Sequence, residues 1–439
     1  MSDHAHSEGH KPFSKSKGYT INELNDCPFG RRLSVLIVAS ILVLCQWYGG
    51  WAFAEGTGGA PDSHGEATRV RVVNVDLRSL PSVAAAKVAS APVKVTLGDN
   101  SESAGTPVEP SYFADPLMSK QQNLAAKAAV GLTVDITLPG IDFTGAVPAD
   151  VVGEVGGGNF VQMVNAPGGS VFAVYDADSG DLVAGPTALS ALWQGAGACA
   201  EGWGQPGVVH DLRADRWVLS ELGAGNHLCV YVSKTGDPVA GGWYAYDFAL
   251  PKFPDFARIG VWTDGYYVAT NEDLPAVYAL ERGAMLNGEA AGWQRFTAPA
   301  LEGFGFQALA PADLDGDSLP DSGTGGLFLR HVDGQAHGGG DRLELFELDV
   351  DWDSAGNSSI SGPTPISTAP FDSSLCGYSA AGCVPQPGTE VTLDPMREVV
   401  MWAVRYRRFD THESLVGNFS VDTGASNHAG IRWFELRRS

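Results

Sequence analysis

The sequence has little positive charge. Its 439 residues include 28 Lys and Arg against 51 Asp and Glu, which gives a net charge of −23 at pH 7. A surface of this sign repels phosphate backbones, so we do not expect a nucleic-acid partner. It favours solubility and attracts divalent cations.

Motifs of several enzyme classes are also missing. The chain has no G-x-S-x-G elbow, no H-E-x-x-H zinc helix and no phosphate-binding loop. The residues therefore indicate no obvious catalyst.

Cysteine is scarce, with six in the chain, four of them beyond residue 55. An even number in an exported chain predicts disulfides, and of the three pairings we favour Cys199–Cys229 with Cys376–Cys383. The first pair would bracket a strand pair, and the second would close a short loop containing glycine. Metal binding is the alternative, but neither pair has the C-x-x-C spacing of a zinc site.

A long apolar run occurs near the N-terminus, at Leu33–Cys45. It follows two arginines and precedes an A-x-A site that ends at Ala54. This order predicts a secretory signal cleaved after Ala54, behind a disordered cytoplasmic leader at 1–32. An uncleaved membrane anchor at 33–54 is the alternative. Either way, we expect the rest of the chain in the periplasm, on the outer surface or outside the cell.

Glycine and proline are abundant, at 55 and 26 residues, and a degenerate phrase recurs. Polar turns followed by short strands rich in aromatic and β-branched residues occur at His210–Leu222, Gly260–Asn271 and Leu393–Tyr406. Small β units of this kind cannot bury their apolar faces alone. We predict an all-β fold, a β-propeller of about five four-stranded blades, with an array of β-sandwiches as the alternative.

The propeller repeats are expected at 148–439. They include a predicted strand at Glu390–Leu393. A linker and a small β-rich extension should occupy 55–147, where Arg69–Val75 and Val93–Leu97 alternate like strands.

From residue 139 onward the chain resembles a family of large exported bacterial β-propeller proteins, mostly uncharacterised. The segments that carry this resemblance are Val151–Gly156, Phe160–Asn165, Ala214–Leu219, Gly260–Asn271, Cys383–Gly388, Arg405–Phe409, His412–Asn418 and Gly430–Leu436. The resemblance implies no agreed activity. Because members usually continue beyond the last segment, it implies a truncated chain and an open ring with an exposed edge.

An acidic loop is the strongest candidate for an ion site. It places carboxylates in a D-x-D-G-D-x-x-x-D pattern at Asp313, Asp315, Asp317 and Asp321. Alternating carboxylates around a glycine turn can direct several oxygens at one Ca²⁺ ion. An ordinary acidic turn is the alternative.

Two further groups are candidates for ligand binding. Trp262, Asp264, Tyr266 and Tyr267 could line a sugar-binding mouth, because aromatic faces stack on sugar rings and carboxylates accept hydroxyl hydrogens. Arg405 and Arg407 lie in a basic island that could bind an acidic group. On the alternative interpretation, the aromatic residues are core and the arginines pair with neighbouring acids.

Taken together, these patterns predict an exported, non-catalytic binding or scaffold module whose partner is a glycan or a cell-surface protein. One alternative is a glycan-active hydrolase or lyase that uses acidic residues at the propeller mouth. The other is a purely structural domain of a surface protein.

Overall fold

The computed structural model describes residues 59–83, 115–118, 134–301, 306–378, 382–397, 399–424 and 428–439. It also describes two short strands, at 20–21 and at 93–94. The predicted signal or anchor at 33–54 lies outside these ranges. Within them, no helix is both long and apolar enough to cross a membrane.

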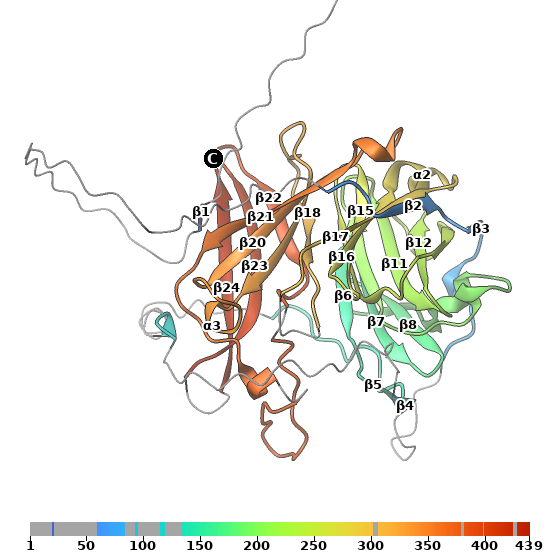
Figure 1. Ribbon diagram of the computed structural model, residues 1–439. Coiled ribbons are helices and arrows are strands. Elements are labelled where there is room, and N and C mark those ends of the chain that lie inside the picture. Colours follow the sequence, from blue (N-terminus) through green and yellow to red (C-terminus); the bar gives the residue numbers. More distant parts are fainter. Residues whose placement is uncertain are drawn as a thin grey trace, which may run out of the picture.

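The fold is an all-β propeller, as predicted, and the described residues form five four-stranded blades. Figure 1 shows them in chain order from teal through green, yellow and orange to red. Blade 1 consists of β6 (Val152–Gly156), β7 (Asn159–Ala166), β8 (Gly169–Asp176) and β9 (Leu182–Ala188). Blade 2 consists of β10 (Gly207–Asp211), β11 (Arg216–Gly223), β12 (His227–Ser233) and β13 (Trp243–Ala249). Blade 3 consists of β14 (Asp255–Val261), β15 (Gly265–Asn271), β16 (Ala276–Glu281) and β17 (Gly292–Thr297).

The last two blades share one sheet. Blade 4 consists of β18 (Ala310–Asp315), β19 (Gly326–Val332), β20 (Arg342–Asp349) and β21 (Ser359–Ser367). Blade 5 consists of β22 (Val404–Arg408), β23 (Glu413–Asp422), β24 (Ala429–Arg438) and β1 (Thr20–Ile21). They are joined because β18 and β22 pair in parallel, with Asp313 opposite Arg405.

Short elements connect the blades. The helices are α2 (Arg282–Asn287) and α3 (Gly334–His337), and the 3₁₀ turns are η1 (Leu77–Ser79), η3 (Leu189–Leu192), η4 (Ala198–Ala200), η5 (Ala355–Asn357) and η6 (Leu375–Tyr378). A parallel pair joins β4 (Val93–Lys94) to β5 (Ala146–Val147). The strand predicted at Glu390–Leu393 is absent: Leu393 forms only an isolated bridge to Val384, and β22 supplies the inner strand of blade 5.

The first strand of each blade lies nearest the propeller axis, and glycines let these inner strands approach closely. A Cβ atom on Gly156 would lie 2.3 Å from the ring of His210 in the next blade. A Cβ atom on Gly260 would lie 2.6 Å from the carbonyl oxygen of Ala312. A residue with a Cβ atom would clash at both positions, with a side-chain ring at Gly156 and with backbone at Gly260.

Three apolar clusters pack the blades face to face. Trp217 lies between blades 1 and 2, and Trp262 lies in the cluster formed by blades 3, 4 and 5; both are fully buried. The aromatic residues of the repeated phrase are therefore largely core, because each blade must bury both faces against its neighbours.

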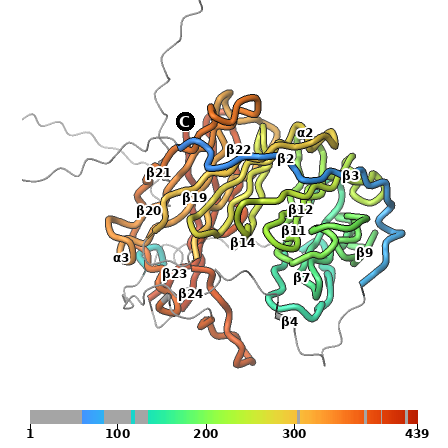
Figure 2. Tube along the Cα trace, turned by 45° about the vertical axis from the view of Figure 1, so that its right-hand side comes forward, coloured from blue at the N-terminus to red at the C-terminus, as the bar shows by residue number. Residues whose placement is uncertain are grey.

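The segment at 59–83 is a strap along the outer edges of four blades, in the reverse of blade order. Gly59 bridges Ile360 of blade 4. β2 (Ser63–Glu66) then pairs with β17 of blade 3, and β3 (Arg69–Val73) pairs with β13 of blade 2. Ser82 finally bridges Thr187 of blade 1. Figure 2 shows this blue segment running from β21 past β2 and β3 towards β9.

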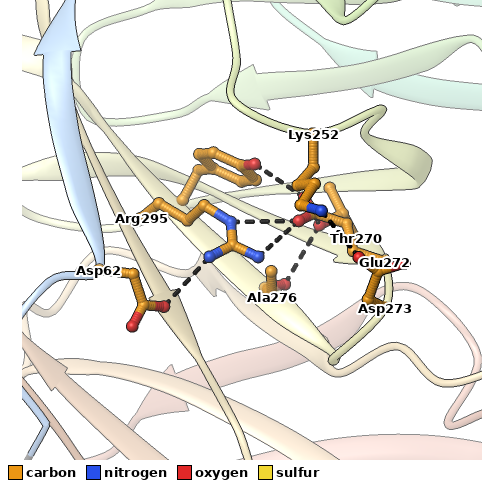
Figure 3. Close-up of polar contacts among 8 residues, drawn as sticks. Asp62, Lys252, Thr270, Glu272, Asp273, Ala276 and Arg295 are labelled. Atoms are coloured by element: carbon orange, nitrogen blue, oxygen red, sulfur yellow. Dashed lines mark hydrogen bonds and ion pairs between the residues drawn. The ribbon is translucent and has the colours of Figure 1, made fainter.

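The strap covers sheet edges that would otherwise offer unpaired backbone groups. It is also fixed by side chains: in Figure 3, Asp62 accepts from Arg295, at 3.1 Å, and Arg295 also binds Glu272. The expected β-rich extension is thus a continuous part of the outer wall of the propeller. β1 similarly pairs along the outer edge of β24. Thr20 and Ile21 belong to the segment predicted as a disordered cytoplasmic leader, so the structure differs from that prediction there, and a chain cleaved after Ala54 would lack this strand.

Both predicted disulfides are confirmed, at Cys199–Cys229 and Cys376–Cys383. The first ties η4 to β12 inside blade 2. Such bonds persist in oxidising compartments outside the cytoplasm.

Candidate active site

The inner strands run in one direction along the axis, so their first residues gather at one end of the propeller, here called the proximal end. Three residues at or just before these strand starts have left-handed backbones although none is glycine: Asp150 (φ 41°), Gln205 (φ 56°) and Phe256 (φ 55°). They introduce blades 1, 2 and 3 in turn. Left-handed non-glycine residues cost energy and cluster at functional sites.

A chain of hydrogen bonds connects these residues around the axis. Asn165 at the end of β7 donates to the carboxylate of Asp150, at 2.9 Å, and accepts from the backbone N–H of Gln205, also at 2.9 Å. The side chain of Gln205 donates to Asp255, at 2.6 Å. Asn271 also donates to Asp255, at 2.9 Å, and accepts from the backbone N–H of Gln307 in blade 4. The network therefore fixes four blades at the proximal end.

The two carboxylates of this network have different surroundings. Asp255 is completely buried, and amide groups bind both of its oxygens. Asp150 is only partly buried. Asp150 is therefore the carboxylate that a ligand can reach, and Asp255 is a positioning group.

Arg258 adds positive charge between these acids. Burial lowers the pKa of its guanidinium, and the carboxylates of Asp150 and Asp255 act in the opposite direction. The guanidinium lies 3.9 Å from the centre of the Phe256 ring, which packs edge-on against Phe306 of blade 4 at 5.0 Å.

A second aromatic pair precedes blades 2 and 3. Trp203 lies two residues before Gln205 and is 42% exposed, and its ring is 6.2 Å from that of Phe253. The proximal end thus combines a reachable carboxylate, a buried carboxylate, an arginine and partly exposed aromatic rings. Such side chains are suited to stacking on a sugar and acting on its hydroxyl and glycosidic oxygens.

The opposite, distal end holds most of the site residues predicted from the sequence. Asp313 is buried, accepts from the backbone N–H of Val261 at 2.8 Å and forms an ion pair with Arg405 at 2.5 Å. Arg405 also binds Glu154 of blade 1, at 2.6 Å. Burial raises the pKa of Asp313 to about 7, although Arg405 and the Val261 N–H oppose this rise. Arg405 therefore links blade 5 to blades 1 and 4.

The other acids of the predicted calcium loop also lie beside arginines. Asp315 is 3.5 Å from Arg407, and Asp321 is 2.7 Å from Arg408. The backbone oxygen of Asp317 accepts from Arg213. In the described part of the chain, no three His, Cys, Asp or Glu side chains are grouped to hold a metal. Calcium binding stays a prediction from the sequence.

The predicted aromatic mouth is wrong for three of its side chains. Trp262, Tyr266 and Tyr267 are all fully buried, because their strand positions face neighbouring blades. The hydroxyl of Tyr267 donates to Asp264, and burial raises the pKa of that carboxyl. Stacking on a sugar therefore cannot use these rings.

Sequence reasoning missed the residues of the proximal end. Asp150 and Asp255 are separated by two blades in the chain and belong to no recognisable motif. The available signal was a proline shortly before each acid, in Pro254-Asp255 and in Pro148-Ala149-Asp150, but 51 acidic residues make such combinations common.

No protein-family description matches the sequence, and no curated protein does. Among solved structures, the chain is similar to an α-L-arabinofuranosidase from Podospora anserina in complex with cellotriose, at 12% identity over 66% of this chain and 90% of that one, with a TM-score of 0.31. It is similar to the catalytic domain of a GH62 α-L-arabinofuranosidase from Coprinopsis cinerea, at 11% identity over 66% and 90%, with a TM-score of 0.29. A third similar structure is an α-L-arabinofuranosidase from Clostridium thermocellum, at 14% identity over 50% and 74%, with a TM-score of 0.26.

These comparisons correct one expectation from the sequence. The similar structures are glycoside hydrolases, so the prediction of a non-catalytic module, and of a chain that is not an enzyme, is contradicted. Of the resemblance to exported bacterial proteins, the β-propeller fold is confirmed, and no family match supports the rest.

Proposed function

We propose that the protein is an exported, glycan-active hydrolase whose active site lies at the proximal end of the propeller. The observation that carries the proposal is the partly buried carboxylate of Asp150, held in a left-handed backbone and hydrogen-bonded by Asn165, at the start of blade 1.

Hydrolysis of a glycosidic bond needs a carboxylate that attacks or takes a proton from water, and an acid that protonates the leaving oxygen. Asp150 suits the first role because its carboxylate is reachable and oriented. It takes a proton from the attacking water, and the leaving oxygen takes its proton from a second water molecule, because the site assigns no side chain to that step. Asp255 is a positioning residue: it fixes Gln205 and Asn271 and supplies negative charge beside Arg258.

The aromatic side chains support a sugar substrate. Trp203 and Phe306 are partly exposed beside the network, where their faces can pack on the apolar side of a sugar ring. The guanidinium of Arg258, which is only partly buried, supplies donors of the kind that sugar hydroxyls require.

The test is activity towards aryl glycosides and polysaccharides. We suggest aryl α-L-arabinofuranoside, aryl β-xyloside and arabinan as first substrates, measured with the protein from residue 59 and with the full chain. Loss of one general acid or base lowers kcat by about 10²–10⁴-fold, so D150N should show a fall of this size.

A matched control is D178N. Asp178 is an exposed acid of the same blade, on the turn after β8, at the distal end. The proposal fails if D150N and D178N have equal activity, or if the wild type hydrolyses no glycoside while it is folded by circular dichroism.

A further inference from the structure

Among the described residues, only one face of blade 5 packs against an apolar core. Leu415, Phe419 and Phe434 point into the core shared with blade 4. Some of the alternate side chains of the same strands are open to solvent, with exposed fractions of 64% for Ile431 and 55% for Trp433, whereas Ser420 opposite Ile431 is buried. We call Val416, Asn418, Ile431 and Trp433 the open face of blade 5.

The open face looks towards blade 1. Arg405 lies opposite Val416 and so on the same side of the sheet as the open face. Its guanidinium binds Glu154 in β6 of blade 1. Val151 and Val155 alternate with Glu154 along β6 and so lie on its other face, where 60% of each is accessible. Blades 5 and 1 are thus linked by an ion pair, and each blade carries exposed apolar side chains close to it in the chain.

This junction is continuous with the candidate active site. Val151 directly follows Asp150 in the chain, so the exposed edge of β6 begins at the proposed catalytic carboxylate. Ile431 and Trp433 lie in the first half of β24, which starts at the proximal end because β24 runs parallel to β22.

We infer that the open face of blade 5 is a binding subsite for an uncharged glycan chain whose reacting bond lies at Asp150. The inference rests on the proposed function and adds a substrate class to it. Trp433 offers an exposed indole, and Asn418 lies directly opposite it on β23, where an amide can bind hydroxyl groups beside the stacked ring.

The charges around the open face favour a ligand without net charge. Arg405 pairs with Glu154 and Asp313, and Arg437 pairs with Glu435, at 2.8 Å. An ionic polymer would have to break these pairs, whereas hydroxyl groups can share them as donors and acceptors.

The test is binding and turnover of a neutral polysaccharide by W433A. Binding is measured with the inactive D150N protein by affinity electrophoresis. The gel contains arabinan or another neutral glycan that slows the migration of the wild-type protein. An aromatic stacking contact is worth about 0.5–1.5 kcal/mol, so W433A in the D150N background should bind up to about tenfold more weakly. W433F should recover part of the affinity.

Turnover separates the subsite from the catalytic groups. In the active protein, W433A should raise KM for the polymer and leave kcat/KM for a small aryl glycoside unchanged. The control is F409A, which removes a 44% exposed ring of the same blade at its distal end and should leave all these values unchanged.

The inference is overturned if W433A and its parent bind the polymer equally, or if W433A and F409A lose the same amount of polymer affinity. It is also overturned if the protein is a dimer in the ultracentrifuge and W433A dissociates it, since the face would then bind a second copy. Glycan binding that depends on Trp433 in a wild type without hydrolase activity would refute the proposed function and leave the subsite standing. Hydrolysis that depends on Asp150 but not on Trp433 would refute the subsite alone.

Discussion

Glu221 gives the sharpest prediction about stability. Its side chain is fully buried between blades 1 and 2, where one oxygen accepts from the backbone N–H of Ser170 at 2.8 Å. The other oxygen is buried and has no hydrogen-bond partner. Gly202 leaves room for the carboxyl group, because a Cβ there would lie 2.4 Å from its oxygen.

Burial raises the pKa of Glu221 from 4.5 to about 8, although the Ser170 N–H opposes the rise. The folded state therefore favours the neutral acid, and the unfolded chain releases its proton more readily. Stability from this group is complete below about pH 4.5 and is lost as the pH rises towards 8. At about 1.4 kcal/mol per pKa unit, the loss is on the order of 5 kcal/mol by pH 9.

E221Q removes this titration and keeps an acceptor for Ser170. We expect the free energy of unfolding of the wild type to fall by several kcal/mol more than that of E221Q between pH 4 and pH 9. Denaturant unfolding at a series of pH values, with the disulfides intact, measures the difference. The exposed Glu289 supplies the control E289Q, which should parallel the wild type. A constant difference between E221Q and wild type across this range would refute the reasoning.

Three other predictions concern how the blades are held together. The Cys199–Cys229 disulfide spans a sequence separation of 30, and the Cys376–Cys383 disulfide one of 7. Removing the first should therefore lower the free energy of unfolding by about 1 kcal/mol more than removing the second. Calorimetry of C199S and C376S tests this, and equal losses of stability would show that loop length does not matter. D62A breaks the partly exposed ion pair that fixes the strap on blade 3, so we expect a loss of at most about 1 kcal/mol and faster proteolysis within 59–83; unchanged cleavage would contradict this role. R405A leaves Asp313 buried without its arginine, so its melting temperature should fall by several degrees at pH 8 and by less at pH 5, where the acid is neutral; the control D353A, at an exposed loop of blade 4, should match the wild type at both pH values.

The repeated architecture was predictable because it depends on local patterns. Alternating apolar residues indicate strands wherever they occur: β15 falls within the repeated phrase that predicted it, and β11 extends one residue beyond its phrase, to Gly223. The pairing Cys199–Cys229 was predictable because the two cysteines bracket one strand pair. What the pattern could not give was which alternate residues face a neighbouring blade, and so Trp262 and Tyr266 were expected at a mouth although they are core.

The proximal site was hidden for a different reason. Its members come from separate blades, and a left-handed backbone at Asp150 or Phe256 leaves no mark on residue type. The strap was likewise hidden, because its strands β2 and β3 pair with partners about 170–230 residues away in the chain. Contacts between residues so far apart in the chain form only when the blades assemble, so the sequence of the segment alone does not specify them.

The most direct measurement is the initial rate of glycoside hydrolysis by the wild type, D150N and D178N, on aryl glycosides and neutral polysaccharides. The account predicts hydrolysis by the wild type, retention of that rate in D178N and a fall of about 10²–10⁴-fold in D150N, with all three proteins folded alike. Equal rates in D150N and the wild type would contradict the proposal that Asp150 at the proximal end of the propeller is catalytic.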